Sequence, residues 1–560
     1  MYLALGAVVV SMGSCSKKLG EFKSDFFNTT PNPLETVGEN VPATISGNIP
    51  AKFMNKSAKV TATPVLVWAT GADTFGEASA QPVVFQGEKV RSNGQVVSYD
   101  NGGTVTIPFN VQYQPEMAES NLYLDFAVDQ NGKLYSLPRV KVGEGVIATS
   151  TLASPASVKP AEAKSNFERI IQEKYSAEIR FLINQANIRA SQTSAADYVD
   201  LNKELIAAND APNREIAGIM IHSYASPDGT LAFNTELAEE RENNTTRYME
   251  NQLKKDKITE FGELTSSFTP EDWEGFQQLV ERSNIQDKDL ILSVLKMYKD
   301  PEQREQEIRN LAGVFNELAD QILPQLRYSK IVATINVIGK SDQELIQLFD
   351  TDPQKLTEDE ILYVASLTND NTRKMQIYQK AAELYPNDYR NFNNLGMTQY
   401  VAGQYDKARE NFTKAARMAP SSKEVEMNQG LLSMLDGNYA KAQEQLGAAA
   451  GLPEAEQAMG VYYLAQGDVQ KAAASLSKGA TNNSALAQIL SKDYAAAQNT
   501  ISSITTPDAT TYYLAAVIGA RTNNPDMVMS NLRKAAQLDN TILEKAARDM
   551  EFASYNLKNL

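Results

Sequence analysis

Residues suited to catalysis are scarce in this chain. Its 560 residues include one histidine, His222, and one cysteine, Cys15. A serine triad would depend on His222 alone, yet the stretch around it is predominantly apolar and lacks the serine or carboxylate motif of a triad. A multi-histidine metal site and a thiolate-cluster site are excluded by the same two counts. We therefore expect His222 to be a strand-end or core histidine.

Carboxylate pairs are the remaining candidates for chemistry. Glu239-Glu240 and Glu271-Asp272 fall on predicted helix surfaces, where solvated charge is the ordinary role. The sequence contains no phosphate-binding loop, dinucleotide fingerprint, zinc-protease motif or EF-hand spacing. We predict a non-enzyme with no catalytic residues, no cofactor and no metal. An enzyme that cleaves peptidoglycan or another glycan with two carboxylates is the least favoured alternative.

Charge and composition narrow the class of partner. Lys and Arg number 53 and Asp and Glu 69, which gives a net charge of −16. This balance argues against nucleic acid, whose phosphates require a positive field. Hydrophobic residues make up 42% and charged residues 22% of the chain, as in ordinary globular proteins. The length predicts about three to five domains.

The N-terminus indicates a lipid anchor. Residues 3–12 are an apolar run too short to span a bilayer but suited to a signal peptide. The motif Met12-Gly13-Ser14-Cys15 resembles the bacterial lipobox, which implies that Cys15 is lipidated after removal of the preceding residues. Residues 1–15 are thus a predicted lipoprotein signal segment; the alternative is a buried N-terminal segment with an incidental cysteine. No later segment approaches 18 consecutive apolar residues, so we expect a membrane-tethered protein rather than a membrane-spanning one.

The residues after Cys15 bear on where the anchor lies. Ser16 is not the aspartate that typically retains lipoproteins at the inner membrane, which favours the outer membrane. Lys17-Lys18 and a lone Glu21 replace the acidic cluster that typically directs surface export. We therefore expect a periplasm-facing anchor, followed by a polar tether over residues 16–36.

Residues 37–149 alternate apolar and polar side chains with the period of strands. The strand candidates include 60–68, 105–113, 122–128 and 134–142, and Gly- and Asn-rich turns separate them. About seven short strands in this length predict an immunoglobulin-like β-sandwich. It contains no polar cluster suited to chemistry, so it is expected to be a spacer or docking module. A linker rich in Ser, Ala and Pro follows over residues 150–165.

Residues 166–345 mix both kinds of element. The pattern predicts helices over 166–174, 187–209 and 232–253, and strands over 178–183 and 215–223. The loop Tyr224-Ala225-Ser226-Pro227-Asp228-Gly229 lies between the second strand and the last helix. This order predicts a small α/β sandwich.

A set of residues around that loop carries a family resemblance. Gly229, Asn234, Leu237 and Arg241 after the strand resemble the OmpA-like peptidoglycan-binding domain. Residues 178–188 resemble that family's first strand, and 330–338 resemble its last. In place of a short crossover the chain inserts about 70 residues, roughly 255–326, with helices expected over 270–280 and 304–322.

The resemblance implies a ligand site at the loop. In the family, a loop aspartate and a helix arginine grip the amine and the carboxylate of peptidoglycan diaminopimelate. Arg241 matches the arginine, and Asn234 is expected to shape the mouth of the site. The aspartate position is Ser226, and Asp228 is the candidate substitute. The alternative for Arg241 is an ion pair on the helix surface with Glu236 or Glu240.

This departure leaves two interpretations of the domain open. Its Ala-Ser-Pro-x-Gly loop looks like a branch found in envelope proteins of Bacteroidetes. In that branch the domain either still contacts peptidoglycan or has become a protein-docking module.

Residues 355–560 repeat with a period near 34. One unit shows Gly396, Gly403, Ala408 and Phe412, and Gly430, Gly437, Ala442 and Leu446 recur 34 positions later. Small residues let paired helices approach while large residues fill the spaces between repeats. These positions resemble the tetratricopeptide repeat, which implies an all-α solenoid that binds protein partners.

Together these segments predict a multi-domain chain: a β-sandwich, an α/β OmpA-like sandwich with a helical insertion, and a tetratricopeptide solenoid. The first hypothesis is a non-catalytic outer-membrane lipoprotein that acts as a scaffold. Its repeats would bind proteins, and its central domain would lie near peptidoglycan. The second is a subunit or chaperone of an outer-membrane assembly or secretion complex. The third is the enzyme considered above.

Overall fold

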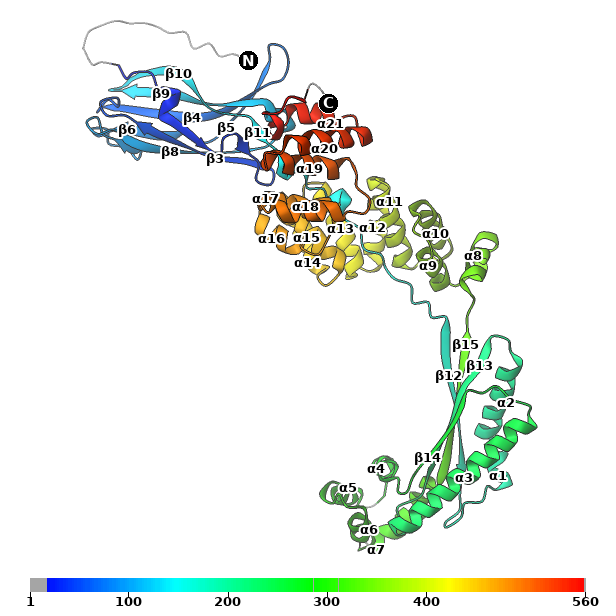
Figure 1. Ribbon diagram of the computed structural model, residues 1–560. Coiled ribbons are helices and arrows are strands. Elements are labelled where there is room, and N and C mark those ends of the chain that lie inside the picture. The colour runs from blue at the N-terminus through cyan, green and yellow to red at the C-terminus, as the bar shows by residue number, and fades with distance from the viewer. Residues whose placement is uncertain (1–17, 286, 311, 558–560) are drawn as a thin grey trace. The chain divides into compact units, whose positions relative to one another are not determined.

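The structure, a computed structural model, describes residues 18–285, 287–310 and 312–557. The chain forms two compact units, which divide after Lys164 and after Leu367 (Figure 1). The second unit, Ser165–Leu367, is therefore inserted between the two parts of the first. Among the helices of these residues, none is long and apolar enough to cross a membrane. The predicted lipidation site, Cys15, lies outside the described residues.

The first unit contains the predicted sheet-rich region, but this region begins before residue 37. Its first strand, Phe27–Thr30, and the buried Leu19 and Phe22 lie within residues 16–36, so the prediction of a polar tether is wrong for these residues. One antiparallel sheet has the order β1-β3-β8 and a larger one the order β10-β9-β4-β6-β7, with β5 paired to β4. The strands are β1 (Phe27–Thr30), β3 (Asn40–Ile49), β4 (Ala58–Ala69), β5 (Phe75–Ser79), β6 (Val83–Gly87), β7 (Gln95–Val97), β8 (Gly103–Gln112), β9 (Ser120–Gln130) and β10 (Lys133–Glu144). Alternate side chains of both sheets share one apolar core, which is why their sequences alternate.

Two short strands close this region. β2 (Leu34–Glu35) pairs in parallel with β11 (Val146–Ile147), which follows β10. The chain then passes through the short 3-10 helices Thr149–Leu152 and Pro155–Ser157.

The second part of the first unit is a series of paired helices, and the predicted helical repeats are confirmed. They are α10 (Asn371–Leu384), α11 (Tyr389–Val401), α12 (Tyr405–Met418), α13 (Lys423–Leu435), α14 (Tyr439–Ala448), α15 (Pro453–Ala465), α16 (Val469–Ser475), α17 (Asn482–Leu490), α18 (Tyr494–Ser503), α19 (Ala509–Arg521), α20 (Pro525–Leu538) and α21 (Ile542–Arg548).

Glycines set the spacing inside these helix pairs. A Cβ atom added at Gly396 would lie 2.7 Å from the Phe412 ring, and one at Gly460 would lie 2.4 Å from Leu476. The same relation holds for Gly430 at 2.8 Å from Leu446. In these three repeats a large side chain at the second helix thus packs directly against a glycine of the first helix.

The second unit is built on a four-stranded sheet with the order β12-β15-β13-β14. Its strands are β12 (Ile170–Arg180), β13 (Arg214–Tyr224), β14 (Glu263–Thr269) and β15 (Tyr328–Ile338). Helices α2 (Ala196–Asp210) and α3 (Leu231–Lys255) pack on one face and share an apolar core with it (Figure 1). The short α1 (Ala190–Thr193) precedes α2. The structure gives an α/β unit, while the finer OmpA-like assignment stays a prediction.

One local prediction in this unit is wrong and another is incomplete. The predicted helix over 166–174 overlaps the strand β12, which pairs antiparallel with β15 from Ile170 to Arg180. That partner lies over 140 residues along the chain, so local propensity is overridden by a distant strand. The predicted helical insertion also supplies a strand that was not predicted, β14, which adds to the sheet parallel to β13.

The rest of the insertion is helical. Helices α4 (Trp273–Arg282), α5 (Lys288–Met297), α6 (Pro301–Asn310) and α7 (Ala312–Gln321) surround a small apolar core of their own. After β15 the chain continues into α8 (Asp342–Thr351) and α9 (Glu358–Ser366), both begun by a capping box.

Candidate functional site

The predicted linker packs against the first helices of the repeats. We call residues 154–164 the strap, and the face formed by α11, α13, α15 and α17 the first-helix face. These four helices contact one another in series, so they present a continuous surface. The strap crosses that surface from α17 towards α11; it begins with the 3-10 helix Pro155–Ser157 and has no regular secondary structure after it.

Three asparagines hold the strap by its backbone. The Asn428 Oδ1 accepts the Ala161 N–H at 2.7 Å, and its Nδ2 donates to the Ala161 carbonyl at 2.8 Å. Asn394 holds both groups of Ala163 in the same way, each at 2.8 Å. At the other end, Asn483 holds both backbone groups of Ser154 at 3.1 Å. Each carboxamide therefore mimics one residue of a pairing β-strand.

Four apolar side chains of the strap are buried. Val158 is 4% exposed, Ala161 1% and Ala163 2%, and Pro160 is buried as well. Val158 and Ala161 belong to the same apolar core as Met427 and Leu431 of α13. Burial of this kind and the asparagine bonds together make the strap part of the folded repeats rather than a free tether.

A charged side chain of the strap also has defined partners. Glu162 lies between the two buried alanines and accepts a hydrogen bond from the hydroxyl of Tyr378 on α10. Lys374, one turn earlier on the same helix, lies 3.5 Å from the Glu162 carboxylate. Burial and the nearby Glu162 raise the pKa of Tyr378, so its hydroxyl stays protonated and available as a donor.

The repeat prediction did not include these asparagines, although the sequence carries a signal for them. Asn394 and Asn428 are 34 residues apart, and each stands two positions before the glycine that packs on the second helix. Asn483 stands two positions before the buried Ala485 in the same manner. A polar residue that recurs at one buried repeat position indicates a ligand or a chain segment on that face.

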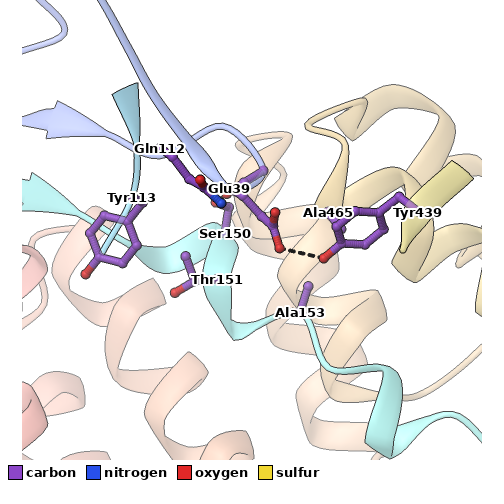
Figure 2. A pocket seen from close by; sticks show the side chains of 9 residues that line it. Glu39, Gln112, Tyr113, Ser150, Thr151, Ala153, Tyr439 and Ala465 are labelled. Carbon is purple, nitrogen blue, oxygen red and sulfur yellow. Dashed lines mark hydrogen bonds between the residues drawn. The ribbon is translucent and has the colours of Figure 1, made fainter. Parts of the chain in front are cut away.

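A cavity of about 220 Å³ lies where the sheet-rich region meets the repeats. Figure 2 shows Glu39 and Tyr439 pointing towards each other across it, joined by a hydrogen bond of 2.6 Å. Gln112, Tyr113 and Ser150 are among the other residues that line it. Burial raises the pKa of Tyr113 to about 12, so this hydroxyl is also neutral. The cavity contains no nucleophile next to a base, and its one lining carboxylate is occupied by Tyr439.

The same junction is held by an ion-pair network. Arg521 of α19 pairs with Glu35 at 2.6 Å and with the buried Glu551, which also accepts a hydrogen bond of 2.6 Å from Thr149. Glu551 is 8% exposed, and burial raises the pKa of its carboxyl. These groups therefore serve the packing of the first unit.

In the second unit, the loop residues of the predicted ligand site come together, but Arg241 faces inward. Its side chain is 0% exposed. The guanidinium donates to the backbone carbonyls of Tyr224 at 2.8 Å, Gln185 at 3.1 Å and Leu182 at 3.4 Å. Burial, with the nearby positive Arg327, lowers its pKa to about 10. The alternative of a helix-surface ion pair is wrong, because Arg241 does not reach the surface.

Ser226 and Asp228 are engaged by a second arginine. The Ser226 Oγ donates to Asp228 Oδ1 at 2.6 Å, and Arg327 pairs with Asp228 Oδ2 at 2.8 Å. Arg327 also donates from Nε to the Ser226 Oγ at 3.1 Å. Arg327 is 7% exposed, so the loop carboxylate is neutralised by a buried group of the same chain.

The insertion covers the other side of the loop. Asn234, 2% exposed, donates to Glu271 at 3.0 Å and to the carbonyl of Gly229 at 3.0 Å. Arg309 of α6 donates to the carbonyl of Asp228. Asn234 thus fastens the loop to the insertion.

His222 lies on the sheet face opposite the helices. Its two ring nitrogens are each 2.7 Å from a hydroxyl, those of Ser267 and Thr269 on β14. Burial lowers the pKa of the imidazole. No group of three or more His, Cys, Asp or Glu side chains in the described parts of the chain is arranged to bind a metal ion. Within those parts we find no constellation suited to catalysis.

Comparison with known families identifies the repeats. The family model of the tetratricopeptide repeat matches residues 377–410, which cover the end of α10, all of α11 and the start of α12. None of the curated proteins compared with this chain matches it.

Several solved structures resemble the chain in part. The APC/C hetero-tetramer Cut9-Hcn1 is 18% identical with a TM-score of 0.33, and the match covers 37% of this chain and 45% of that one. This chain therefore spans less than half the length of that relative. A tetratricopeptide repeat protein from Parabacteroides merdae is 14% identical, with a TM-score of 0.30 over 37% of this chain and 91% of that chain. The type IV pilus biogenesis factor PilW is 16% identical, with a TM-score of 0.27 over 32% and 92%.

Proposed function

We propose that the chain is a non-catalytic scaffold of the bacterial cell envelope, on whose repeats protein partners dock. The observation that carries the proposal is the first-helix face, which already holds an extended peptide segment, the strap. Asn394, Asn428 and Asn483 contact its backbone rather than particular side chains. A surface built in this way is suited to protein segments and not to small metabolites.

The location forms a second part of the proposal. Cys15 would carry a lipid anchor, and Ser16 favours the outer membrane. Lys17-Lys18 with a lone Glu21 in place of an acidic cluster favours the inner leaflet, facing the periplasm. Substitution Cys15→Ser should move the full-length chain from the membrane to the soluble fraction. A variant that still fractionates with outer membranes would refute the anchor. Protease treatment of intact cells that removed the repeats would refute the periplasmic orientation.

For the central unit we favour protein docking over peptidoglycan binding. The supporting contacts are those of Arg241, which donates to three backbone carbonyls, and of Asp228, which pairs with Arg327. Arg241 is 0% exposed and each carboxylate oxygen of Asp228 already has a partner, so we expect neither group to bind a diaminopimelate zwitterion. Full-length chain mixed with purified sacculi should stay in the supernatant after centrifugation. Sedimentation with sacculi would restore the peptidoglycan-binding interpretation.

The scaffold role is tested by crosslinking in native membranes. Full-length chain with an affinity tag should yield a recurring set of proteins crosslinked to lysines of the repeats, such as Lys407 and Lys414 on α12. A set dominated by one outer-membrane β-barrel would support the assembly- or secretion-complex hypothesis instead. Release of soluble muropeptides from sacculi by the purified chain would overturn the non-catalytic assignment.

A further inference from the structure

The contacts of the strap define a recognition pattern more specific than an open groove. Its central residues Ala161, Glu162 and Ala163 alternate between two environments. The alanines face the first helices and are almost fully buried, whereas Glu162 faces α10. The pattern on the peptide is therefore small, acidic, small.

The two alanine positions limit side-chain size. Ala161 is 1% and Ala163 2% exposed, while both backbone groups of each are held by a rigid carboxamide. Asn393 adds a third bond, which its Nδ2 donates to the Ala161 carbonyl at 3.1 Å. Because the backbone is fixed at this distance, a larger side chain has no space without moving a helix.

The acidic position, Glu162, is bound by the ammonium group of Lys374 and the hydroxyl of Tyr378. Lys374 is 19% exposed in its side chain, and Tyr378 is 0% exposed. Both project from consecutive turns of α10, so they converge on one carboxylate. A glutamine at this position would keep a weak acceptor for Tyr378 but lose the attraction to Lys374.

We propose that this face is an exchangeable site for an extended small–acidic–small segment of a partner protein, and that the strap is its built-in competitor. The proposal rests on the proposed scaffold function and names the chemistry of the segment that docks there. A partner that inserts such a segment displaces residues 154–164 and takes over the bonds of Asn394 and Asn428.

The strap sets a threshold for that exchange. A segment tethered in the same chain has an effective concentration on the order of millimolar. A free peptide with the same contacts must therefore reach roughly millimolar concentration to displace half of the strap. A partner succeeds at lower concentration only by adding contacts beyond the tripeptide.

The test uses a full-length chain whose strap no longer fits. In the double variant Ala161→Arg and Ala163→Arg, the charged side chains cannot enter the alanine positions, so the face is vacated. The probe is a fluorescein-labelled peptide with the sequence of residues 153–165, ASPASVKPAEAKS, followed by fluorescence anisotropy. The vacated chain should bind this peptide, and a further Asn428→Ala substitution should weaken binding at least tenfold. A probe with glutamine in place of the glutamate should bind about 10- to 100-fold more weakly, as expected for loss of a charge-assisted contact.

The wild-type chain provides an independent measurement that does not depend on the double variant. Hydrogen exchange at the amides of Ala161 and Ala163 should accelerate when the labelled peptide is added at several millimolar. Unchanged exchange at that concentration would show that the strap is permanent and overturn the proposal. If the double variant folds but does not bind the peptide, the proposal is overturned as well. If the glutamate and glutamine probes bind equally, the acidic position is not recognised.

These outcomes are separable from the scaffold role. If the peptide does not bind while the membrane crosslinks to the repeats persist, only the exchange at the first-helix face is refuted. If the crosslinks are missing as well, the scaffold function itself is refuted.

Discussion

The side-chain amide of Asn428 brackets the backbone of Ala161, accepting its N–H at 2.7 Å and donating to its carbonyl at 2.8 Å across 267 residues of sequence. The two groups belong to segments separated by the whole second unit. Their contact shows that the stretch between the sheet-rich region and the second unit is part of the repeat fold.

Substitution Asn428→Ala should loosen the strap. It leaves the buried Ala161 N–H without an acceptor, which costs about 1–3 kcal/mol of unfolding free energy. Hydrogen exchange read by mass spectrometry should show faster exchange over residues 154–164. The matched control is Asn411→Ala, a buried asparagine of α12 that bonds Gln399 and not the strap. Equal acceleration in both variants would mean that the substitution had weakened the repeats in general and not the bonds between Asn428 and the strap.

Substitution Gly38→Ala should weaken the junction between the sheet-rich region and the repeats. Gly38 has φ +61°, and an added Cβ would lie 2.2 Å from the backbone oxygen of Ala465. Gly403 has φ +71° with nothing within 4 Å of its added Cβ, so Gly403→Ala isolates the cost of the left-handed conformation, about 1–2 kcal/mol. Thermal unfolding should show a clearly larger loss for Gly38→Ala. Equal losses of stability in the two variants would show that the backbone at Ala465 can move to accept the added Cβ at no measurable cost.

Substitution Ser226→Asp should destabilise the second unit and confer no binding of diaminopimelate. The new carboxylate would lie against Asp228, whose Oδ1 is 2.6 Å from the serine hydroxyl, so the two like charges would repel and would compete for Arg327. We expect a loss of about 1–3 kcal/mol in denaturant unfolding, against about 0.5–1.5 kcal/mol for the control Ser226→Ala. A Ser226→Asp chain that binds diaminopimelate by calorimetry would contradict this and revive the ligand site.

The single histidine permits a pH measurement on the second unit. Burial lowers the pKa of His222 from its usual 6.5, so folding favours the neutral ring. As pH falls through 6.5 the unfolded chain takes up a proton before the folded chain does, and stability decreases until the folded pKa is passed. One imidazole signal should titrate below 6.5 by NMR, and His222→Gln should flatten the fall in stability. A signal that titrates above 6.5 would mean that folding favours the protonated ring, which would contradict the expected fall in stability.

The parts predicted from sequence are those fixed by local periodicity. Gly396 and Phe412 belong to one repeat, and their spacing alone indicated that one helix packs on the other. The alternation of Val105, Ile107 and Phe109 similarly indicated a strand with one buried face. Both features depend on residues close in sequence, and the structure confirms the helical repeats and the sheet-rich region.

The parts missed from sequence depend on distant partners. Residues 170–180 form a strand because β15 pairs with them, and the strap is ordered because Asn394, Asn428 and Asn483 receive it. Arg241 occupies the motif position that the resemblance indicates, yet the motif carries no information about which group its guanidinium meets. Arg327, which neutralises Asp228, lies about 100 residues further on and belongs to no part of that motif.

The direction of the strap has a mechanical consequence. Tension along the direct covalent connection between the sheet-rich region and the second unit passes through residues 154–164. The clamps of Asn483, Asn428 and Asn394 lie one after another along the pulled segment, and carboxamide bonds of this kind run across a strand rather than along it. Such a load shears the clamps together instead of peeling them one by one. The bonds to the repeats would therefore keep residues 154–164 at a fixed length until the force is large enough to release the whole strap.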